Sequence, residues 1–312
     1  MKRLLLLSLI FALLACSTPE PPLRIGSNVW PGYEALYLAR HHGHFNKLPI
    51  KLVELASASD LMDGIRNGQL DGGGLTLDEV LLLASEGIDM TIVALCDISA
   101  GADVVMARPG INNLAALAGK TIAAETTAVG AVMLAGALRQ AGLSEHQVRI
   151  VHMPLADQLP AYQRGEIDAA VSFEPFKTHL QQAGAQVLFD SRQIAGDIVD
   201  VLALRSEVVA QKPYVVQQLV RGYLRANYLL VQGDEAALAY VNRRLRLPPE
   251  RLPMLFEGMQ IPSLQQHHHW LRHDAEVKAA ELAPLLYRKG LLRYQVERLP
   301  QATTQFLPEL RP

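Results

Sequence analysis

The chain has 312 residues, 29 basic and 31 acidic side chains, and a formal net charge of −2 at pH 7. This balance gives no support for a nucleic-acid-binding surface, which needs a basic stripe. The length is sufficient for two lobes of ordinary domain size. Only Cys16 and Cys96 occur, and because Cys16 has another predicted role, no disulfide within the chain is expected.

The N-terminus has the pattern of a secretory signal. Lys2 and Arg3 precede 11 mostly apolar residues, too few to span a bilayer, which takes about 20. Leu13-Leu14-Ala15-Cys16 resembles the bacterial lipobox, so residues 1–15 are predicted to be removed and Cys16 lipidated; an ordinary signal peptide is the alternative. Residues 16–22 are predicted to be a tether. Ser17 after Cys16 favours lipid anchoring in the outer membrane, facing the periplasm.

Beyond the tether, apolar runs alternate with segments of helical periodicity, which predicts an α/β fold with a largely parallel sheet. Strands are predicted over residues 23–26, 50–55, 72–75, 91–95, 120–123, 148–153 and 167–171. Helices are predicted over residues 34–42, 59–67, 78–86, 130–141 and 156–164, with one more ending at residue 182. Cys96 follows an apolar run and is predicted to be a small buried residue.

The alternation repeats at a fixed offset. Gly68 and Gly165, Asp71 and Asp168, and Ile25 and Ile122 are each 97 residues apart. Three pairs at one offset predict two lobes with the same order of strands and helices. The offset is too long for a solenoid period.

The last third is mainly helical, with helices predicted over residues 213–231, 235–246 and 273–290. The apolar run 199–204 is predicted to be a strand that returns to the first lobe. Residues 23–104 and 200–312 are therefore assigned to lobe 1 and residues 105–199 to lobe 2. Two crossings, near residues 103–108 and 196–204, would form a hinge.

Ligands in such folds lie at the carboxyl ends of strands, so five strand-to-helix turns are predicted to form a cleft. In the first turn, Pro31 and Gly32 change the direction of the chain. Aromatic residues are scarce in the chain as a whole but are concentrated around this turn. Alternatives are a core role for Trp30 and a helix-dipole role for Glu34. In the second, Thr76 and Glu79 fit a capping box, which leaves Asp78 for either solvent or the cleft.

Of the other three turns, two offer small or polar residues, and the last contains Phe173 and Glu174. Gly101 would let a ligand approach the backbone, while Asp103 is either a ligand contact or a surface turn residue. Hydroxyl groups in the turn after residue 124 either contact a ligand or cap the helix. The predicted ligand-binding set is Asn28, Trp30, Tyr33, Glu34, Thr76, Asp78, Gly101, Asp103, Glu125, Thr126, Thr127, Phe173 and Glu174.

These turns contain aromatic rings and carboxylates but no Arg or Lys. Aromatic faces with carboxylates suit a cation or a nitrogen-rich ring, whereas an anion is more naturally held by Arg. Histidines cluster at residues 41–44 and 267–273 without the ligand spacing of a defined metal site, and a solvated face is expected. No catalytic motif occurs, so neither an enzyme nor a cofactor is predicted.

Four segments resemble the nitrate/sulfonate/taurine and thiamine-precursor group of bacterial solute-binding lipoproteins. They are RIGSNVWPGYEALYLARHHGHF, GQLDGGGLTLDEVL, LAALAGKTIAAE and GEIDAAVSFEPF. The resemblance implies a type II periplasmic-binding architecture, with two α/β lobes on a two-crossing hinge and C-terminal helices packed on lobe 1. It also implies a monomeric receptor that delivers a small solute to an ABC permease and ATPase. Alternatives are the input of a transmembrane kinase or cyclase, an oxyanion or sulfonate binder, and an enzyme like the pyrimidine synthase of this group.

Overall fold

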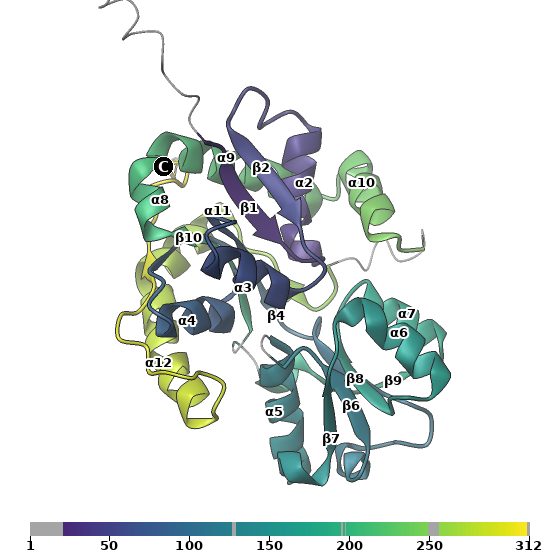
Figure 1. Cartoon of the computed structure of the whole chain (residues 1–312). Coiled ribbons are helices and arrows are strands. Elements are labelled where there is room, and N and C mark those ends of the chain that lie inside the picture. The colour runs from purple at the N-terminus through teal and green to yellow at the C-terminus, as the bar shows by residue number, and fades with distance from the viewer. Residues whose placement is uncertain (1–20, 127–128, 195, 197, 249–255, 311–312) are drawn as a thin grey trace, which may run out of the picture.

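The computed structural model describes residues 21–126, 129–194, 196, 198–248 and 256–310, and it contains two separate sheets (Figure 1). The first sheet has the order β11-β4-β10-β3-β1-β2, with β12 paired to β4. Its strands are β1 (Leu23–Ser27), β2 (Ile50–Glu54), β3 (Gly72–Thr76), β4 (Met90–Ser99), β10 (Val199–Arg205), β11 (Met259–Gln260) and β12 (Gln301–Ala302).

The second sheet has the order β7-β6-β8-β5-β9. Its strands are β5 (Val104–Ala107), β6 (Thr121–Ala124), β7 (Arg149–His152), β8 (Ala169–Ser172) and β9 (Gln186–Asp190). In each sheet the strand reached by a crossing, β10 or β5, runs antiparallel to both of its neighbours, while the first three strands of each repeat are parallel.

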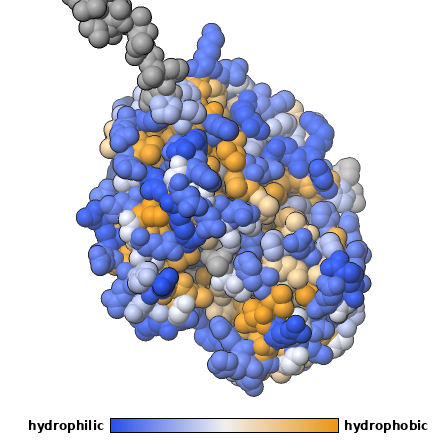
Figure 2. All heavy atoms as spheres, in the orientation of Figure 1, coloured by the Kyte–Doolittle hydropathy of each residue, from blue (hydrophilic) through white to orange (hydrophobic). Residues whose placement is uncertain are grey.

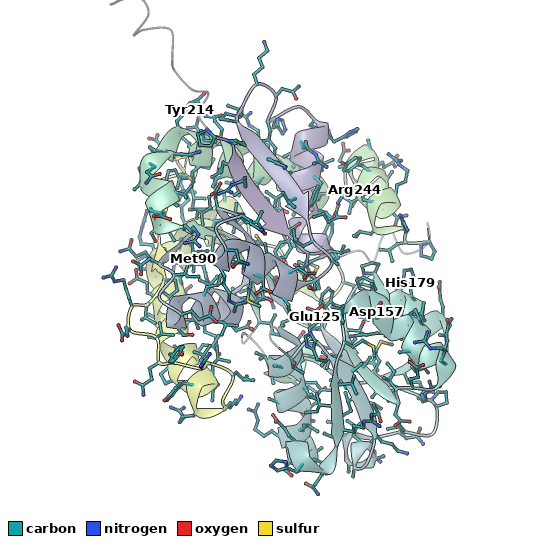
Figure 3. The ribbon with its side chains drawn as sticks, in the orientation of Figure 1. Met90, Glu125, Asp157, His179, Tyr214 and Arg244 are labelled. Atoms are coloured by element: carbon teal, nitrogen blue, oxygen red, sulfur yellow. The ribbon has the colours of Figure 1, made fainter. Side chains whose placement is uncertain are left out.

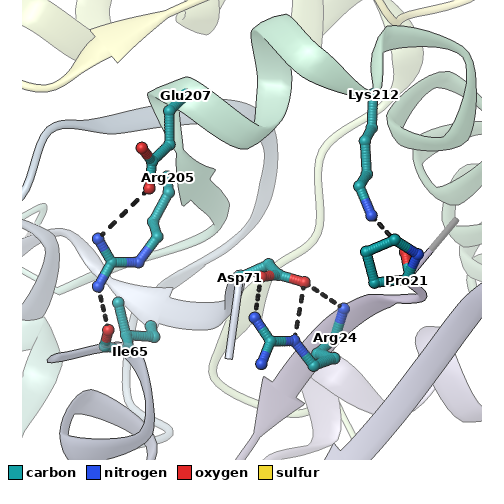
Figure 4. Close-up of polar contacts among 7 residues, drawn as sticks. All are labelled: Pro21, Arg24, Ile65, Asp71, Arg205, Glu207 and Lys212. Atoms are coloured by element: carbon teal, nitrogen blue, oxygen red, sulfur yellow. Dashed lines mark hydrogen bonds and ion pairs between the residues drawn. The ribbon is translucent and has the colours of Figure 1, made fainter. Parts of the chain in front are cut away.

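The predicted repeat is confirmed at the level of hydrogen bonds. Ile25 pairs with Gly72 in the first sheet, and Ile122 pairs with Ala169, 97 residues later, in the second. Asp71 accepts the N–H of Arg24 at 2.7 Å, and Asp168 accepts the N–H of Thr121 at 2.9 Å. Within the part of the chain that the structure describes, only the first of these aspartates also binds an arginine side chain (Figure 4).

Helices cover both sheets. They are α2 (Glu34–His41), α3 (Ala58–Arg66), α4 (Leu77–Ser85), α5 (Val129–Ala141), α6 (Leu155–Arg164), α7 (Phe176–Gln182), α8 (Ser206–Gln211), α9 (Pro213–Val231), α10 (Glu235–Leu245), α11 (Leu264–His269) and α12 (Ala275–Arg288). As predicted, the C-terminal helices pack on the first lobe, because α9 contacts α2 and α12 contacts α4. None of the helices in the described residues combines the length and apolar character needed to cross a membrane.

The two crossings lie between β4 and β5 and between β9 and β10, and they are hydrogen-bonded to each other. The hydroxyl groups of Ser99 and Ser191 are 2.7 Å apart, and the Gly101 N–H donates to Ser191 Oγ at 2.6 Å. Residues 104–107, expected in the first crossing, are instead strand β5. Four residues give too short an apolar run to distinguish a strand from a connection.

The surface facing the viewer in Figure 2 is mainly hydrophilic, with smaller hydrophobic areas over both halves. Buried apolar side chains from both sheets form one large core, which includes Cys96 as expected. The histidine prediction is partly wrong. His267 and His268 are buried, and burial lowers the pKa of His267 to about 4. His41, His42, His269 and His273 are exposed as expected.

Replacing Asp71 by Ala should lower the free energy of unfolding by about 1–3 kcal/mol, because it leaves the Arg24 N–H without its acceptor. Asp71→Asn, which keeps an acceptor oxygen, should lose less. Urea unfolding measures both. Asp157→Ala, on an exposed part of α6, is the control and should stay within about 0.5 kcal/mol of wild type. Equal stabilities of Asp71→Ala and the control would contradict the assigned role.

Candidate functional site

The turns that follow strands of both sheets meet around a small cavity. Its volume is about 20 Å³, roughly enough for one water molecule. None of the described residues lining it is Arg, Lys or His. The lining residues are Asn28, Trp30, Tyr33, Thr76, Glu79, Asp103, Val129, Phe173, Ile198 and Asp200.

Two aromatic rings from opposite lobes meet at this cavity. Trp30 follows β1 and Phe173 follows β8, and their rings make an edge-to-face contact with centroids 5.1 Å apart. Trp30 Nε1 also donates to Asp97 Oδ2 at 3.1 Å. Gly32 is needed beside them, because a Cβ atom there would lie 2.0 Å from the same carboxylate oxygen. The Pro-Gly turn thus places Trp30 against both an acid and the other lobe.

A pair of buried aspartates lies at the site, and one of them, Asp200, lines the cavity. Asp97 on β4 and Asp200 on β10 are paired residues of neighbouring strands. Burial raises the pKa of Asp97 to about 8, and it raises the pKa of Asp200 well above its ordinary value, with the charge of Asp97 adding to the effect. The Tyr33 hydroxyl donates to Asp200 at 2.5 Å. The ring of Tyr33 lies on Gly74, where a Cβ atom would come within 2.6 Å of it.

The start of α4 adds two further acids. The Glu79 carboxylate accepts the N–H of Thr76 at 2.9 Å, which is the backbone half of the predicted capping box. Burial raises the pKa of Glu79 well above its ordinary value, and the charge of Asp78 adds to the effect. Burial raises the pKa of Asp78 to about 6. Asp78 lines a neighbouring cavity of similar size together with Thr126.

Two more predicted acids lie where the lobes meet. Asp103, at the end of the first crossing, is 2% exposed, and burial raises its pKa to about 6 although Lys177 opposes this. Burial raises the pKa of Glu125 to about 7, although hydrogen bonds from the backbone N–H groups of Ala58 and Leu155 lower it. Ala58 belongs to the first lobe, and Figure 3 shows Glu125 at the junction of the two halves.

Other predicted residues lie apart from the small cavity. Glu34 is bound by Arg244 of α10, with Nε to Oε2 at 2.6 Å, so its carboxylate serves packing within lobe 1. Glu174 accepts the Thr178 hydroxyl at 2.9 Å and, with Gly101, lines a separate cavity of about 330 Å³ beside the crossings. Thr126 donates its N–H to His152 Nδ1 at 3.2 Å. Thr127 lies outside the described residues, as does the predicted lipidation site Cys16.

The sequence analysis missed three acids of the site. Glu79 was assigned to capping alone, and Asp97 and Asp200 were not selected. A signal for the two aspartates was present, since each is a lone carboxylate within an apolar strand, in LCDIS and VDVLAL. Such a position is buried, and a buried charge without a partner marks a functional site.

The site offers oxygen atoms that could contact a ligand. In the described residues no three His, Cys, Asp or Glu side chains are arranged to hold a metal ion. Several buried oxygens in those residues have no hydrogen-bond partner, among them Asp78 Oδ1, Asp97 Oδ1 and Asp103 Oδ2. Asp103 lines the small cavity and Asp78 the neighbouring one, so both carboxyl groups could accept hydrogen bonds from a ligand there.

Two sheets of one topology, joined by two crossings with a polar cavity between them, define a class of protein. This is the type II fold of the periplasmic solute-binding proteins. Residues 17–243 match the NMT1-like family, and the chain belongs to that family.

Curated relatives and a solved structure agree with this assignment. The chain is 26% identical over 251 residues to the "putative aliphatic sulfonates-binding protein" of Escherichia coli K12, covering 76% of each chain. It is 25% identical over 243 residues to the "taurine-binding periplasmic protein" of the same organism, covering 75% of this chain and 76% of that protein. The alkanesulfonate-binding protein of Xanthomonas axonopodis pv. citri, bound to MOPS, superposes with a TM-score of 0.73 at 20% identity, over 88% of this chain and 97% of that one.

The stability of the ligand-free protein should fall as the pH rises from about 5 to 8. The buried carboxyl groups have a higher pKa folded than unfolded, so the folded state binds more protons in this window. For each group that stays protonated only in the folded state, the free energy of unfolding falls by about 1.4 kcal/mol per pH unit. Melting temperatures across the window measure the trend.

Asp97→Asn should make this pH dependence shallower, whereas the exposed control Asp157→Asn should leave it unchanged. A melting temperature that rises between pH 5 and 8 would contradict the assignment.

Proposed function

We propose that the chain is the receptor of an ABC importer and captures a small cationic or nitrogen-rich heteroaromatic solute between its lobes. Family membership and fold support the receptor role. The observation that carries the choice of solute is the lining of the small cavity, which contains the buried carboxyl groups of Glu79, Asp103 and Asp200 and no basic residue among those described.

Electrostatics favour a cation in this cavity. A positive charge about 4 Å from a carboxylate gains roughly 4 kcal/mol at an effective dielectric constant of 20, and an anion loses as much. An ammonium group also brings three donors for the buried oxygens that lack partners. Trp30 and Phe173 add aromatic surface, which suits a cation or a flat ring.

Capture requires the lobes to separate, because a cavity of about 20 Å³ does not admit an organic solute. The crossings near Ser99 and Ser191 are the natural hinge, and opening breaks contacts between the lobes such as that of Trp30 with Phe173. A ligand that bridges the two lobes stabilises the closed form, which a membrane partner then recognises.

An aliphatic sulfonate is the second candidate, and the names of the curated relatives favour it. A zwitterion such as taurine would place its ammonium group on the carboxylates and its sulfonate on backbone N–H groups. A transmembrane kinase or cyclase in place of the permease remains an alternative partner. The family relatives support a binding role and not an enzymatic one.

Calorimetric titration of amines, pyrimidines, taurine, alkanesulfonates and nitrate distinguishes these solutes. A cation should bind, and its affinity should rise with pH up to about tenfold per unit below pH 8, because Asp97 must release its proton. Asp200→Asn should weaken binding by at least tenfold, and Asp157→Asn should not. Binding of nitrate or a simple sulfonate with no response to Asp200→Asn would refute the cationic ligand.

We also propose that Cys16 carries the lipid that holds the receptor at the membrane. Cys16→Ala should abolish acyl incorporation and move the protein from the membrane pellet to the soluble periplasmic fraction. Metabolic labelling with a fatty acid and fractionation measure both. Continued acylation or unchanged membrane retention would contradict the anchor.

A further inference from the structure

One face of α9 carries a row of side chains of which Tyr214, Arg225 and Tyr228 are exposed and Gln218 and Arg221 are half-buried. Tyr214, Gln218, Arg221, Arg225 and Tyr228 follow one another at alternating steps of four and three residues, which aligns them along one side of the helix. This row is called the α9 stripe. Its two tyrosines are each 64% exposed, more than any other large apolar side chain in the described residues.

The charge of this face is positive. Helix α9 contains no acidic residue, and neither Arg221 nor Arg225 forms an ion pair with another residue that the structure describes. His44 lies beside Arg225, whose charge adds to burial in lowering the pKa of that histidine. The opposite side of α9 is buried and contacts α2, so the stripe is not needed for the core.

The described part of the chain begins at Pro21, close to the start of α9. Lys212, just before α9, donates from its Nζ to the carbonyl oxygen of Pro21 (Figure 4). Figure 3 shows Tyr214 on the same side of the molecule as the start of the described chain. Five residue steps separate Cys16 from Pro21 and can span at most about 18 Å.

We infer that the α9 stripe rests on an anionic phospholipid surface when the receptor is anchored. The inference rests on the proposed lipid at Cys16, which would hold the Tyr214 end of α9 within that reach of the bilayer. Tyrosine rings suit the membrane–water interface, and arginine side chains bind lipid phosphates. Helix α12 lies at the far side of lobe 1 from the start of the chain (Figure 1).

The test uses the acylated full chain reconstituted into vesicles, with an environment-sensitive dye on a single introduced cysteine. Gln218→Cys reports from the middle of the stripe and keeps its tyrosines and arginines. Val277→Cys, 57% exposed on α12, is the matched control position. Cys96 is buried and should not react with the dye.

In vesicles containing phosphatidylglycerol, the dye at residue 218 should shift to the blue and the dye at residue 277 should not. Vesicles of phosphatidylcholine alone should give a smaller shift, and high salt should reverse it. Arg221→Gln with Arg225→Gln should weaken docking of the stripe by about 30-fold. The double control Arg272→Gln with Arg288→Gln removes the same charge from exposed positions elsewhere and should have no effect.

Three results would overturn the inference. If the acylated chain binds the vesicles but the dye at residue 218 reports an aqueous environment, the lipid-facing stripe is refuted and the anchor is not. If the dye at residue 218 shifts to the blue only when other envelope proteins are added, the stripe contacts a protein and not the lipid surface. A chain that does not remain with the vesicles would refute the anchor, and with it the stripe.

Discussion

Burial of Asp97 and Asp200 without a basic partner among the described residues is the constraint on which the site depends. Asp97 and Asp200 face each other on neighbouring strands, and burial raises the pKa of both. A fold optimised for stability alone would place apolar side chains there. The surrounding structure holds these acids in place: Trp30 and Tyr33 each donate one hydrogen bond to them, and Gly32 leaves room for the Asp97 carboxylate. Their burial therefore supports the proposal that these acids contact a ligand.

Much of the fold was predictable because its signals are local and repeated. Strand and helix periodicity predicted most of the major elements, and the 97-residue offset predicted two lobes with the same order of strands and helices. Strands β5 and β9 and helices α8 and α11 were missed, since each is only four to six residues long and shows no clear periodicity. The π-helical turn between α11 and α12 was missed as well, since the sequence there gives no sign of departing from an ordinary helix.

The site was predictable only in part, because sequence position fixes which turn a residue occupies but not its partners. Trp30, Tyr33 and Phe173 follow strand ends, and all three line the cavity. Glu34 occupies the same turn, yet Arg244, 210 residues later, binds its carboxylate. Asp200 lies in a strand that returns from the other lobe, so its place beside Asp97 depends on the topology of the crossings.

Gly74, which lies against the Tyr33 ring, offers a route by which the ligand specificity of related receptors would diverge. Any side chain at residue 74 would displace the Tyr33 ring, and with it the hydroxyl group that contacts Asp200. A single nucleotide change could thus alter the depth of the pocket and release one carboxylate without touching a ligand-contacting residue. Descendants of one ancestral receptor would then differ in ligand size through a position that does not line the pocket.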